Sequence, residues 1–310
     1  MRAAILSDVD RPPVYAEHPG VLPREGQIVA DVLAAGLHHL TRARATGRHY
    51  SSSVPLPLVP GVDGVVRDPD GALRYIALDE TRIGTFAEQT AFDADRSIML
   101  PANADPVTIA AGMNPGMSSW IALRRRIQMP VGARVLVIGA TGAAGRLAVQ
   151  IAKLLGASHV TAAGRDAARL APLRARGADS VVTLDGLAGA ADVDVVLDYI
   201  WGEPVASALV PLLMRRRDRS TALRWIQLGS MAGSTAAIPA AALRSSRLEL
   251  IGSGIGAVRA DEIVDELPAL AEAFASGELT VPVRAVPLSD VEQHWADVGS
   301  ERIVFQPAGS

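Results

Sequence analysis

Three glycines spaced three residues apart carry the strongest chemical signal in the sequence. Gly139, Gly142 and Gly145 follow an apolar run at 135–138 and open an apolar-periodic stretch, which predicts a strand, a tight turn and a helix. Glycine lets the backbone approach a pyrophosphate closely, and the N–H groups that open a helix favour its charge. The alternative is a turn in which small residues serve packing alone. The expected dinucleotide-binding residues are Gly139, Thr141, Gly142, Ala143, Ala144 and Gly145.

The end of the next predicted strand indicates which dinucleotide binds. Sites for NAD place an acidic side chain about 20 residues beyond the turn, whereas an arginine there accommodates the 2′-phosphate of NADP. Here the strand at 159–163 is followed by Gly164 and Arg165, and Asp166 is expected to cap the next helix. The predicted cofactor is therefore NADP(H), with Arg169 sharing or replacing the role of Arg165. The alternative for Arg165 is a solvated side chain at a helix start.

Small residues also follow two later predicted strands, RWIQL and LELI. Open α/β sheets bind ligands at the carboxyl ends of their strands, which makes these residues candidates for cofactor contacts, although glycine there also commonly forms turns. The residues concerned are Gly229, Ser230, Gly252, Ser253 and Gly254.

Two domains are predicted, the second of which interrupts the first. Strand-like and helix-like segments alternate between 133 and 251, as in a parallel, doubly wound sheet. A helix between Asp105 and Arg126 is expected to enter that domain. A helix is expected at 261–276, with strand and turn chemistry after it. The expected fold class is α/β, with a Rossmann domain at 115–255 and a β-rich domain made of 1–114 and 256–310.

The composition excludes several kinds of chemistry. Of 310 residues, 49% are hydrophobic and 20% charged, and the net charge of -3 implies no basic surface for nucleic acid. Cysteine is absent, which excludes disulfides, thiolate metal ligands and cysteine nucleophiles. Lys153 is the only lysine, so an anion must be held by arginine or backbone amides, while Arg215–Arg217 is expected to be a solvated helix end. No window approaches the roughly 18 apolar residues of a membrane helix, and we expect a cytoplasmic protein.

Motifs spread over nearly the whole chain carry a family resemblance. They are VLAAGLHH, PLVPGVDGVV, GTFAEQ, NPGMSSWIAL, VLVIGATGAAG and VPLSDVEQHW. Together they resemble the medium-chain dehydrogenase/reductase superfamily, in particular its zinc-free quinone oxidoreductase and enoyl reductase branches, and they imply that the β-rich domain is GroES-like. The zinc-dependent relatives would have cysteine at His38, histidine at Val62, glutamate at Asp63 and cysteine at Asn114. The tetrahedral ligand set is thus incomplete, and no metal is expected.

The same resemblance implies residues in a cleft beside the nicotinamide. Tyr50 corresponds to a tyrosine able to orient a carbonyl oxygen or donate a proton, with a packed aromatic as the alternative. His39 would be a polar residue of the cleft that can relay a proton. Asn114 would hydrogen-bond the nicotinamide amide or the substrate, or else be a turn residue before Pro115. Ser118 would lie near the nicotinamide amide, unless it caps a helix.

The resemblance and the incomplete zinc ligand set together imply the reaction. Alcohol oxidation needs a Lewis acid, whereas hydride delivery to a quinone or a conjugated C=C bond needs hydrogen bonds to the developing oxyanion and a proton donor. We therefore predict NADPH-dependent reduction of a quinone or an activated alkene, such as an enone, an enal or an enoyl thioester. The alternatives are zinc-free carbonyl or alcohol chemistry and a non-catalytic NADPH-binding protein. A homodimer that pairs sheet edges near residues 245–256 is also implied.

Overall fold

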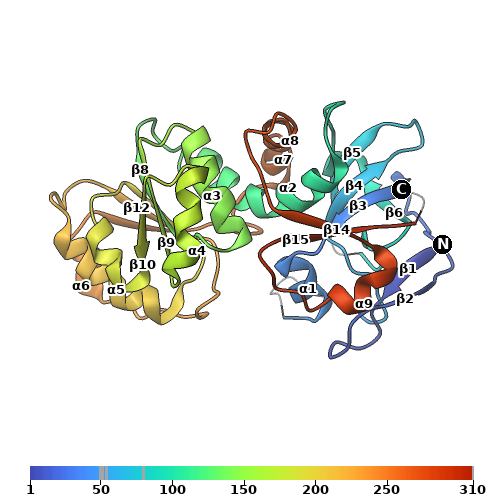
Figure 1. Ribbon diagram of the computed structural model, residues 1–310, viewed down its shortest axis with the longest axis horizontal. Coiled ribbons are helices and arrows are strands. Elements are labelled where there is room, and N and C mark those ends of the chain that lie inside the picture. The colour runs from blue at the N-terminus through green and yellow to red at the C-terminus, as the bar shows by residue number, and fades with distance from the viewer. Residues whose placement is uncertain (49–51, 53–54, 79–80, 309–310) are drawn as a thin grey trace. The chain divides into compact units, whose positions relative to one another are not determined.

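In the computed structural model the chain is described over residues 1–48, 52, 55–78 and 81–308, and it divides into two compact units. The mixed-sheet unit comprises Met1–Pro115 and Val264–Ser310, and the parallel-sheet unit comprises Gly116–Ile263. One has a mainly antiparallel sheet and the other a parallel sheet accompanied by helices (Figure 1). The predicted α/β fold class is therefore confirmed.

The described part of the parallel-sheet unit contains a six-stranded sheet in the order β10-β9-β8-β11-β12-β13. All neighbouring strands run parallel. The chain runs outward from β8 to β10 and then returns to β11 on the other side of β8, which places the switch point of a doubly wound sheet between β8 and β11. The strands are β8 (Arg134–Ile138), β9 (His159–Gly164), β10 (Ser180–Thr183), β11 (Val195–Asp198), β12 (Leu223–Gln227) and β13 (Leu248–Gly252).

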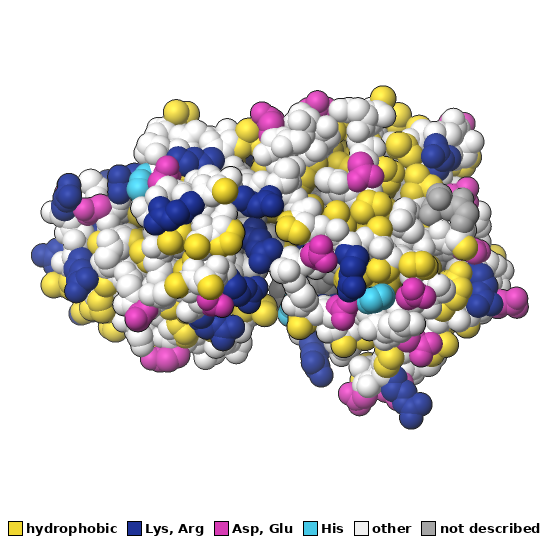
Figure 2. Space-filling view, viewed as in Figure 1, with side chains coloured by type: hydrophobic (Ala, Val, Ile, Leu, Met, Phe, Trp, Pro, Cys, Tyr) yellow, Lys and Arg dark blue, Asp and Glu magenta, His cyan; other side chains and the backbone are white. Residues whose placement is uncertain are grey.

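Helices bury the apolar strands of this sheet. Helix α3 (Ala143–Leu154) packs against β8 and β9, and α5 (Gly202–Arg215) belongs to an apolar cluster with Leu136, Val196 and Trp225. Near-continuous apolar strands are typical of parallel sheets whose two faces are covered. Figure 2 shows Lys and Arg side chains gathered over the face that α3 and α4 cover. The shorter helical elements are η2 (Ala122–Arg126), α4 (Ala167–Leu170), η3 (Ala171–Arg176), η4 (Leu184–Ala190) and α6 (Ala240–Arg244).

The mixed-sheet unit is built around a sheet of the order β14-β15-β3-β4-β5-β7, with β6 also paired to β3. Only the β14–β15 pairing is parallel among the described strands of this sheet. Phe86 and Phe305 pack edge to face in its core, with ring centroids 5.0 Å apart. The strands are β3 (Gln27–Gly36), β4 (Asp63–Arg67), β5 (Leu73–Ala77), β6 (Gln89–Asp93), β7 (Ser97–Met99), β14 (Val283–Pro287) and β15 (Arg302–Gln306), besides the separate pair β1 (Arg2–Ile5) and β2 (Val14–Glu17). The helical elements are α1 (His39–Ala45), η1 (Ala94–Arg96), α8 (Leu267–Ala275), η5 (Leu288–Asp290) and α9 (Val291–His294).

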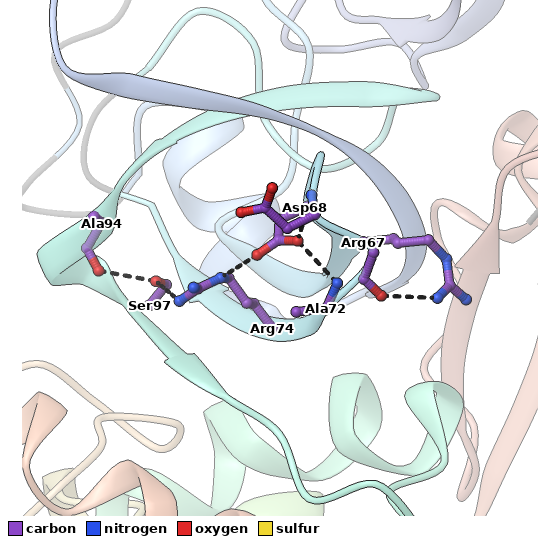
Figure 3. Close-up of polar contacts among 8 residues, drawn as sticks. Arg67, Asp68, Ala72, Arg74, Ala94 and Ser97 are labelled. Atoms are coloured by element: carbon purple, nitrogen blue, oxygen red, sulfur yellow. Dashed lines mark hydrogen bonds and ion pairs between the residues drawn. The ribbon is translucent and has the colours of Figure 1, made fainter.

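An aspartate closes the turn between β4 and β5 of this unit. The Asp68 carboxylate accepts hydrogen bonds from the backbone N–H groups of Asp70 and Ala72, at 3.1 and 2.9 Å (Figure 3). It also accepts one from Arg74 Nε at 2.7 Å, and this hydrogen bond with the arginine holds the pKa of Asp68 below its usual value. Arg74 in turn donates to Ser97 Oγ on β7, so one side chain ties the turn to a third strand.

One expectation about the helices is wrong, and two alternatives are excluded. Residues 261–276 form two helices, α7 (Ala260–Val264) and α8, because Pro268 lies in the first turn of α8, where a proline starts a helix but cannot continue one. Asn114 lies inside helix α2 (Pro106–Ile121), as does Pro115, so the turn interpretation of Asn114 is excluded. Ser118 is also interior to α2 and does not cap its N-terminus.

The expectation that Arg215–Arg217 is a solvated helix end is wrong for its central residue. Arg216 is only 8% exposed and donates to the backbone carbonyl groups of Ala191 and Val193, at 3.1 and 2.6 Å. A buried guanidinium needs such partners, since an unsatisfied buried charge is costly. Arg216 therefore ties the end of α5 to the segment that precedes β11. No helix in the described part of the chain is long and apolar enough to cross a membrane.

Candidate active site

The turn between β8 and α3 requires glycine at Gly139 and Gly145, for a different reason at each. Gly139 has a φ of +86°, and an added Cβ would lie 3.1 Å from Cβ of Tyr199. Gly142 is exposed at the N-cap of α3, and Gly145 is so tightly packed that an added Cβ would lie 2.2 Å from the carbonyl oxygen of Gly139. Helix α3 has no acidic residue in its first turn. Its opening N–H groups, with the exposed Gly142 beside them, therefore favour an anion.

The end of β9 lies beside this turn. An added Cβ on Gly164 would lie 3.2 Å from Thr141 Cγ2, and the Arg169 guanidinium donates to the carbonyl oxygen of Thr141 at 3.5 Å. The Asp166 carboxylate accepts hydrogen bonds from backbone N–H groups two and three residues later, at 2.8 and 3.4 Å, which confirms that it caps α4. Arg165 is exposed directly after Gly164. Asp166 is thus engaged as a helix cap, while Arg165 and Arg169 lie at or near the glycine turn.

A pair of hydroxyl groups lies close to the same turn. Ser118 Oγ and Tyr199 Oη are 3.1 Å apart. The backbone of Tyr199 also packs closely against Gly229, where an added Cβ would lie 2.6 Å from the Tyr199 carbonyl oxygen. Burial raises the pKa of Tyr199 to about 12, so the phenol keeps its proton at neutral pH. The sequence makes Tyr199, beyond the predicted strand VDVVLD, a candidate for lining the cofactor cleft, with packing beneath the cleft as the alternative. The signal that points to it is its position directly after β11, at the carboxyl edge of the sheet.

The remaining expected cofactor residues, Gly229, Ser230, Gly252, Ser253 and Gly254, lie at the carboxyl ends of β12 and β13. The Gly229 N–H donates to the carbonyl oxygen of Asp198 at 3.1 Å. The carbonyl oxygen of Gly252 accepts two hydrogen bonds from Arg126, at 3.1 and 2.9 Å. Ser230 and Gly254 are exposed at the same edge of the sheet. Gly229 and Gly252 therefore have backbone roles in the segments that end their strands.

His38 of the mixed-sheet unit is part of a buried polar cluster. His38 Nε2 lies 3.0 Å from Asp63 Oδ1, and the hydroxyl of the fully buried Tyr75 donates to Asp63 Oδ2 at 2.7 Å. On its other side, His38 Nδ1 accepts a hydrogen bond from the Arg302 guanidinium. Burial lowers the pKa of His38 and lowers that of Arg302 to about 10.

The residues of this cluster include two of the positions that would bind zinc in the zinc-dependent relatives, His38 and Asp63. A guanidinium can only donate, so the neutral His38 ring carries its proton on Nε2, which faces Asp63. Nδ1 is then occupied by Arg302, and Nε2 is buried 3.0 Å from the Asp63 carboxylate. Val62 offers no ligand atom, and Asn114 offers an amide in place of a thiolate. Within the described residues, no three His, Asp or Glu side chains come close enough together to hold a metal ion.

The three predicted catalytic residues have different surroundings. Asn114 is half-buried in α2, four residues before Ser118, so the two residues lie on the same face of that helix. His39 is the first residue of α1 and is exposed. Tyr50 lies outside the described residues. The structure therefore brings Gly139, Thr141, Gly164, Arg169 and Ser118 into one region of the parallel-sheet unit, while His39 belongs to the mixed-sheet unit.

Known proteins resemble this chain over much or nearly all of its length. A probable NADPH-dependent quinone reductase of Emericella nidulans is 28% identical, in an alignment that covers 99% of this chain and 100% of the relative. An NADPH-dependent alkenal/one oxidoreductase of Arabidopsis thaliana is 30% identical over 57% of this chain and 50% of its own. The quinone oxidoreductase of Thermus thermophilus, solved alone and with NADPH, is 25% identical, covers 99% of this chain and 100% of its own, and superposes with a TM-score of 0.83. No family model matches the chain.

A doubly wound parallel sheet with a glycine turn after its first strand, inserted between two parts of a β-rich unit, defines a two-domain protein of the dinucleotide-binding class. The end-to-end likenesses narrow that class further. Over its whole length the chain is similar to quinone oxidoreductases, which supports the resemblance to the zinc-free branches of the medium-chain dehydrogenase/reductase superfamily.

Proposed function

We propose that the protein is an NADPH-dependent oxidoreductase that reduces a quinone or an activated C=C bond without zinc. The observation that carries this proposal is the glycine turn at Gly139–Gly145 beside a second strand that ends in Gly164 and Arg165. This arrangement suits a pyrophosphate and a 2′-phosphate, because the first turn of α3 has no acidic residue and Asp166, which closely follows β9, caps α4. Relatives named for NADPH-dependent reduction of quinones and of alkenals or alkenones support the same cofactor and acceptors.

The residues of the parallel-sheet unit would hold the cofactor. The N–H groups of Ala143 and Ala144, with Gly142 beside them, bind the pyrophosphate, and Arg165 with Arg169 binds the 2′-phosphate. When bound, NADPH supplies a hydride. The hydroxyl groups of Ser118 and Tyr199, 3.1 Å apart, orient the nicotinamide amide. The position of Tyr199 next to Gly139 and Gly229 supports this role.

The substrate side of the reaction requires an oxyanion partner and a proton donor. The amide of Asn114 would hold the oxygen on which negative charge develops, and the Tyr50 phenol or the His39 imidazole would deliver the proton. Zinc has no part in this scheme, because His38 is engaged by Asp63 and Arg302 and because Val62 has no ligand atom. Hydride transfer to a quinone or a conjugated alkene proceeds without a Lewis acid when hydrogen bonds hold the oxyanion.

Initial rates of NADPH oxidation test this proposal, with NADH measured in parallel. The acceptors are 2-cyclohexenone, a 2-alkenal, a crotonyl thioester and 1,4-benzoquinone, each assayed before and after treatment with a chelator. We expect turnover that prefers NADPH and is unchanged by chelation. Oxidation of secondary alcohols with no turnover of the acceptors would favour carbonyl or alcohol chemistry instead. Tight NADPH binding with no oxidation by any acceptor would favour a non-catalytic binding protein.

We propose further that the enzyme is a cytoplasmic homodimer that pairs sheet edges near residues 245–256. In support, β13 (Leu248–Gly252) is an edge strand of the parallel sheet, and Leu250 on it is 38% exposed. An edge strand presents backbone N–H and C=O groups to a second strand.

A further inference from the structure

Helix α3 carries an arginine immediately after the glycine turn. The Arg146 N–H donates to the carbonyl oxygen of Gly142 at 2.9 Å, which places this residue in the first turns of the helix. Positions 146, 150 and 153 share one face of α3, since they are four and three residues apart. Element η3 packs along α3, and an added Cβ on Gly177, directly after η3, would lie 3.0 Å from Lys153 Cγ. Arg146 thus lies at the turn end of the helix face that η3 covers.

Two other arginines act on this residue. Burial lowers the pKa of Arg146, and the positive charges of Arg169 and Arg176 lower it further. Arg176 ends η3, and Arg169 donates to the carbonyl oxygen of Thr141 within the glycine turn. The charges of Arg169 and Arg176 therefore lie near enough to act on Arg146, and Arg169 is held at the glycine turn. An anion placed among them would relieve their mutual repulsion.

The opposite end of the same helix face has a different charge arrangement. Lys153 Nζ lies 2.7 Å from Asp179 Oδ2, so a carboxylate serves the cation at the C-terminal end of α3. At the turn end, Asp166 accepts hydrogen bonds from the backbone of α4 as its cap. The helix dipole disfavours cations near an N-terminus and favours them near a C-terminus. An anion bound near the N-terminus of α3 would therefore lower the electrostatic cost of a cation at Arg146.

We propose that Arg146, on α3 itself, binds the 2′-phosphate of NADPH together with Arg169 and Arg176 and thereby sets the preference for NADPH over NADH. This inference rests on the proposed function, because it assigns a residue to the cofactor site of that reaction. Guanidinium groups suit the role, since they stay charged and bind phosphate oxygens through paired N–H donors. Arg146 is a specificity-determining residue in this proposal and takes no part in hydride or proton transfer.

Titration calorimetry on the full chain tests the inference with NADPH, NADH and adenosine 2′-phosphate as probes. We expect Arg146→Gln to weaken binding of NADPH and of adenosine 2′-phosphate about tenfold, as for loss of a charge-assisted hydrogen bond, and to change NADH binding less than about twofold. Arg146→Lys keeps the charge without the paired donors and should retain part of the preference. The matched control is Arg217→Gln, which removes an arginine whose side chain is 91% exposed in the same unit.

The outcomes separate this inference from the proposed function. If the wild-type protein binds neither dinucleotide, the inference and the proposed function both fail. If the wild-type protein prefers NADPH and Arg146→Gln has the same ratio of the NADH and NADPH dissociation constants, only the role of Arg146 is overturned. Equal weakening of NADPH and NADH also overturns it, because that result indicates a structural or pyrophosphate role. If Arg146→Gln does not fold, an unchanged ratio in Arg146→Lys decides against the inference.

Discussion

Gly145 has no space for a side chain, and this property can be tested with a single methyl group. An added Cβ would lie 2.2 Å from the Gly139 carbonyl oxygen, so Gly145→Ala must open the turn that receives the pyrophosphate. We expect at least tenfold weaker NADPH binding and a loss of about 1–3 kcal/mol in the free energy of unfolding, as for overpacked sites. Fluorescence titration and urea denaturation measure the two effects. Gly189→Ala is the matched control, since nothing lies within 4 Å of its added Cβ. Wild-type affinity in Gly145→Ala would contradict the assignment of the turn.

His38 predicts a pH dependence of stability. Burial lowers its pKa in the folded protein, whereas the unfolded value is about 6.5. As the pH falls below the unfolded pKa, the unfolded chain takes up the proton first, so the contribution of His38 is complete above that pH and is lost below it. We expect the free energy of unfolding to fall between about pH 7.5 and 5.5, and to fall less steeply in His38→Asn.

The neighbouring histidine supplies the control for this measurement. His39 is exposed at the start of α1, so His39→Asn should keep the wild-type slope of stability against pH. Denaturant titrations at several pH values on the three proteins give the comparison. An unchanged slope in His38→Asn would show that the buried cluster does not exclude the proton.

At the scale of single residues, local features were predictable and distant partners were not. The glycine spacing and the cap at Asp166 depend on neighbours within a few positions, so the sequence pattern contains them. The partner of His38, Arg302, lies 264 positions away, and no local pattern brings the two together. Arg216 shows the same limit, because its burial depends on carbonyl groups more than 20 positions earlier.

At the scale of elements, the turn between β4 and β5 depends on one carboxylate. Asp68 accepts hydrogen bonds from two backbone N–H groups and from Arg74, and its replacement leaves those donors without this acceptor. We expect Asp68→Ala to reduce the local stability of β4 and β5 by about 1–3 kcal/mol. Hydrogen exchange of the amides in these strands measures the effect.

Asp70 in the same turn provides the comparison. It is exposed and takes part in the turn through its backbone N–H, so Asp70→Ala should change the exchange by less than the equivalent of about 0.5 kcal/mol. Similar exchange in both variants would mean that the backbone alone holds the turn.

Helix boundaries show why element prediction has limits. A proline biases the preceding residue away from helix, and that rule left a turn at Asn114 as the alternative to the helix expected between Asp105 and Arg126. In α2 the flanking residues Ala111 and Met113 are fully buried, so packing overrides the local preference. The opposite occurs between α7 and α8, where Pro268 does mark a helix start. A proline thus lies inside one predicted helix and divides another, because burial of the neighbouring residues decides the outcome and sequence periodicity reports burial only approximately.

At the scale of the whole molecule, the sheet of the parallel-sheet unit followed from its connections. Alternating strands and helices can form a parallel sheet with right-handed crossovers in few ways, and the predicted doubly wound sheet is confirmed. No comparable rule limits the order in which the antiparallel strands of the mixed-sheet unit pair. Their pairing joins β15 to β3 across most of the chain, and its register depends on a core that forms only in the folded state.

The proposed homodimer gives the prediction at this scale. If two copies pair along β13, a lysine introduced on that strand would lose its hydration at the interface. Natural sheets use lysine on edge strands to prevent such pairing. We expect the wild-type protein to be a dimer by light scattering after size-exclusion chromatography, and Leu250→Lys to be a monomer over the same concentrations. The control is Val131→Lys, an apolar-to-lysine change at a 90% exposed position of the same unit, which should remain dimeric. Both variants must retain the thermal unfolding of the wild type, so that a change in mass reports assembly alone. A monomeric wild-type protein would contradict the proposed dimer, and a dimeric Leu250→Lys would move the interface away from β13.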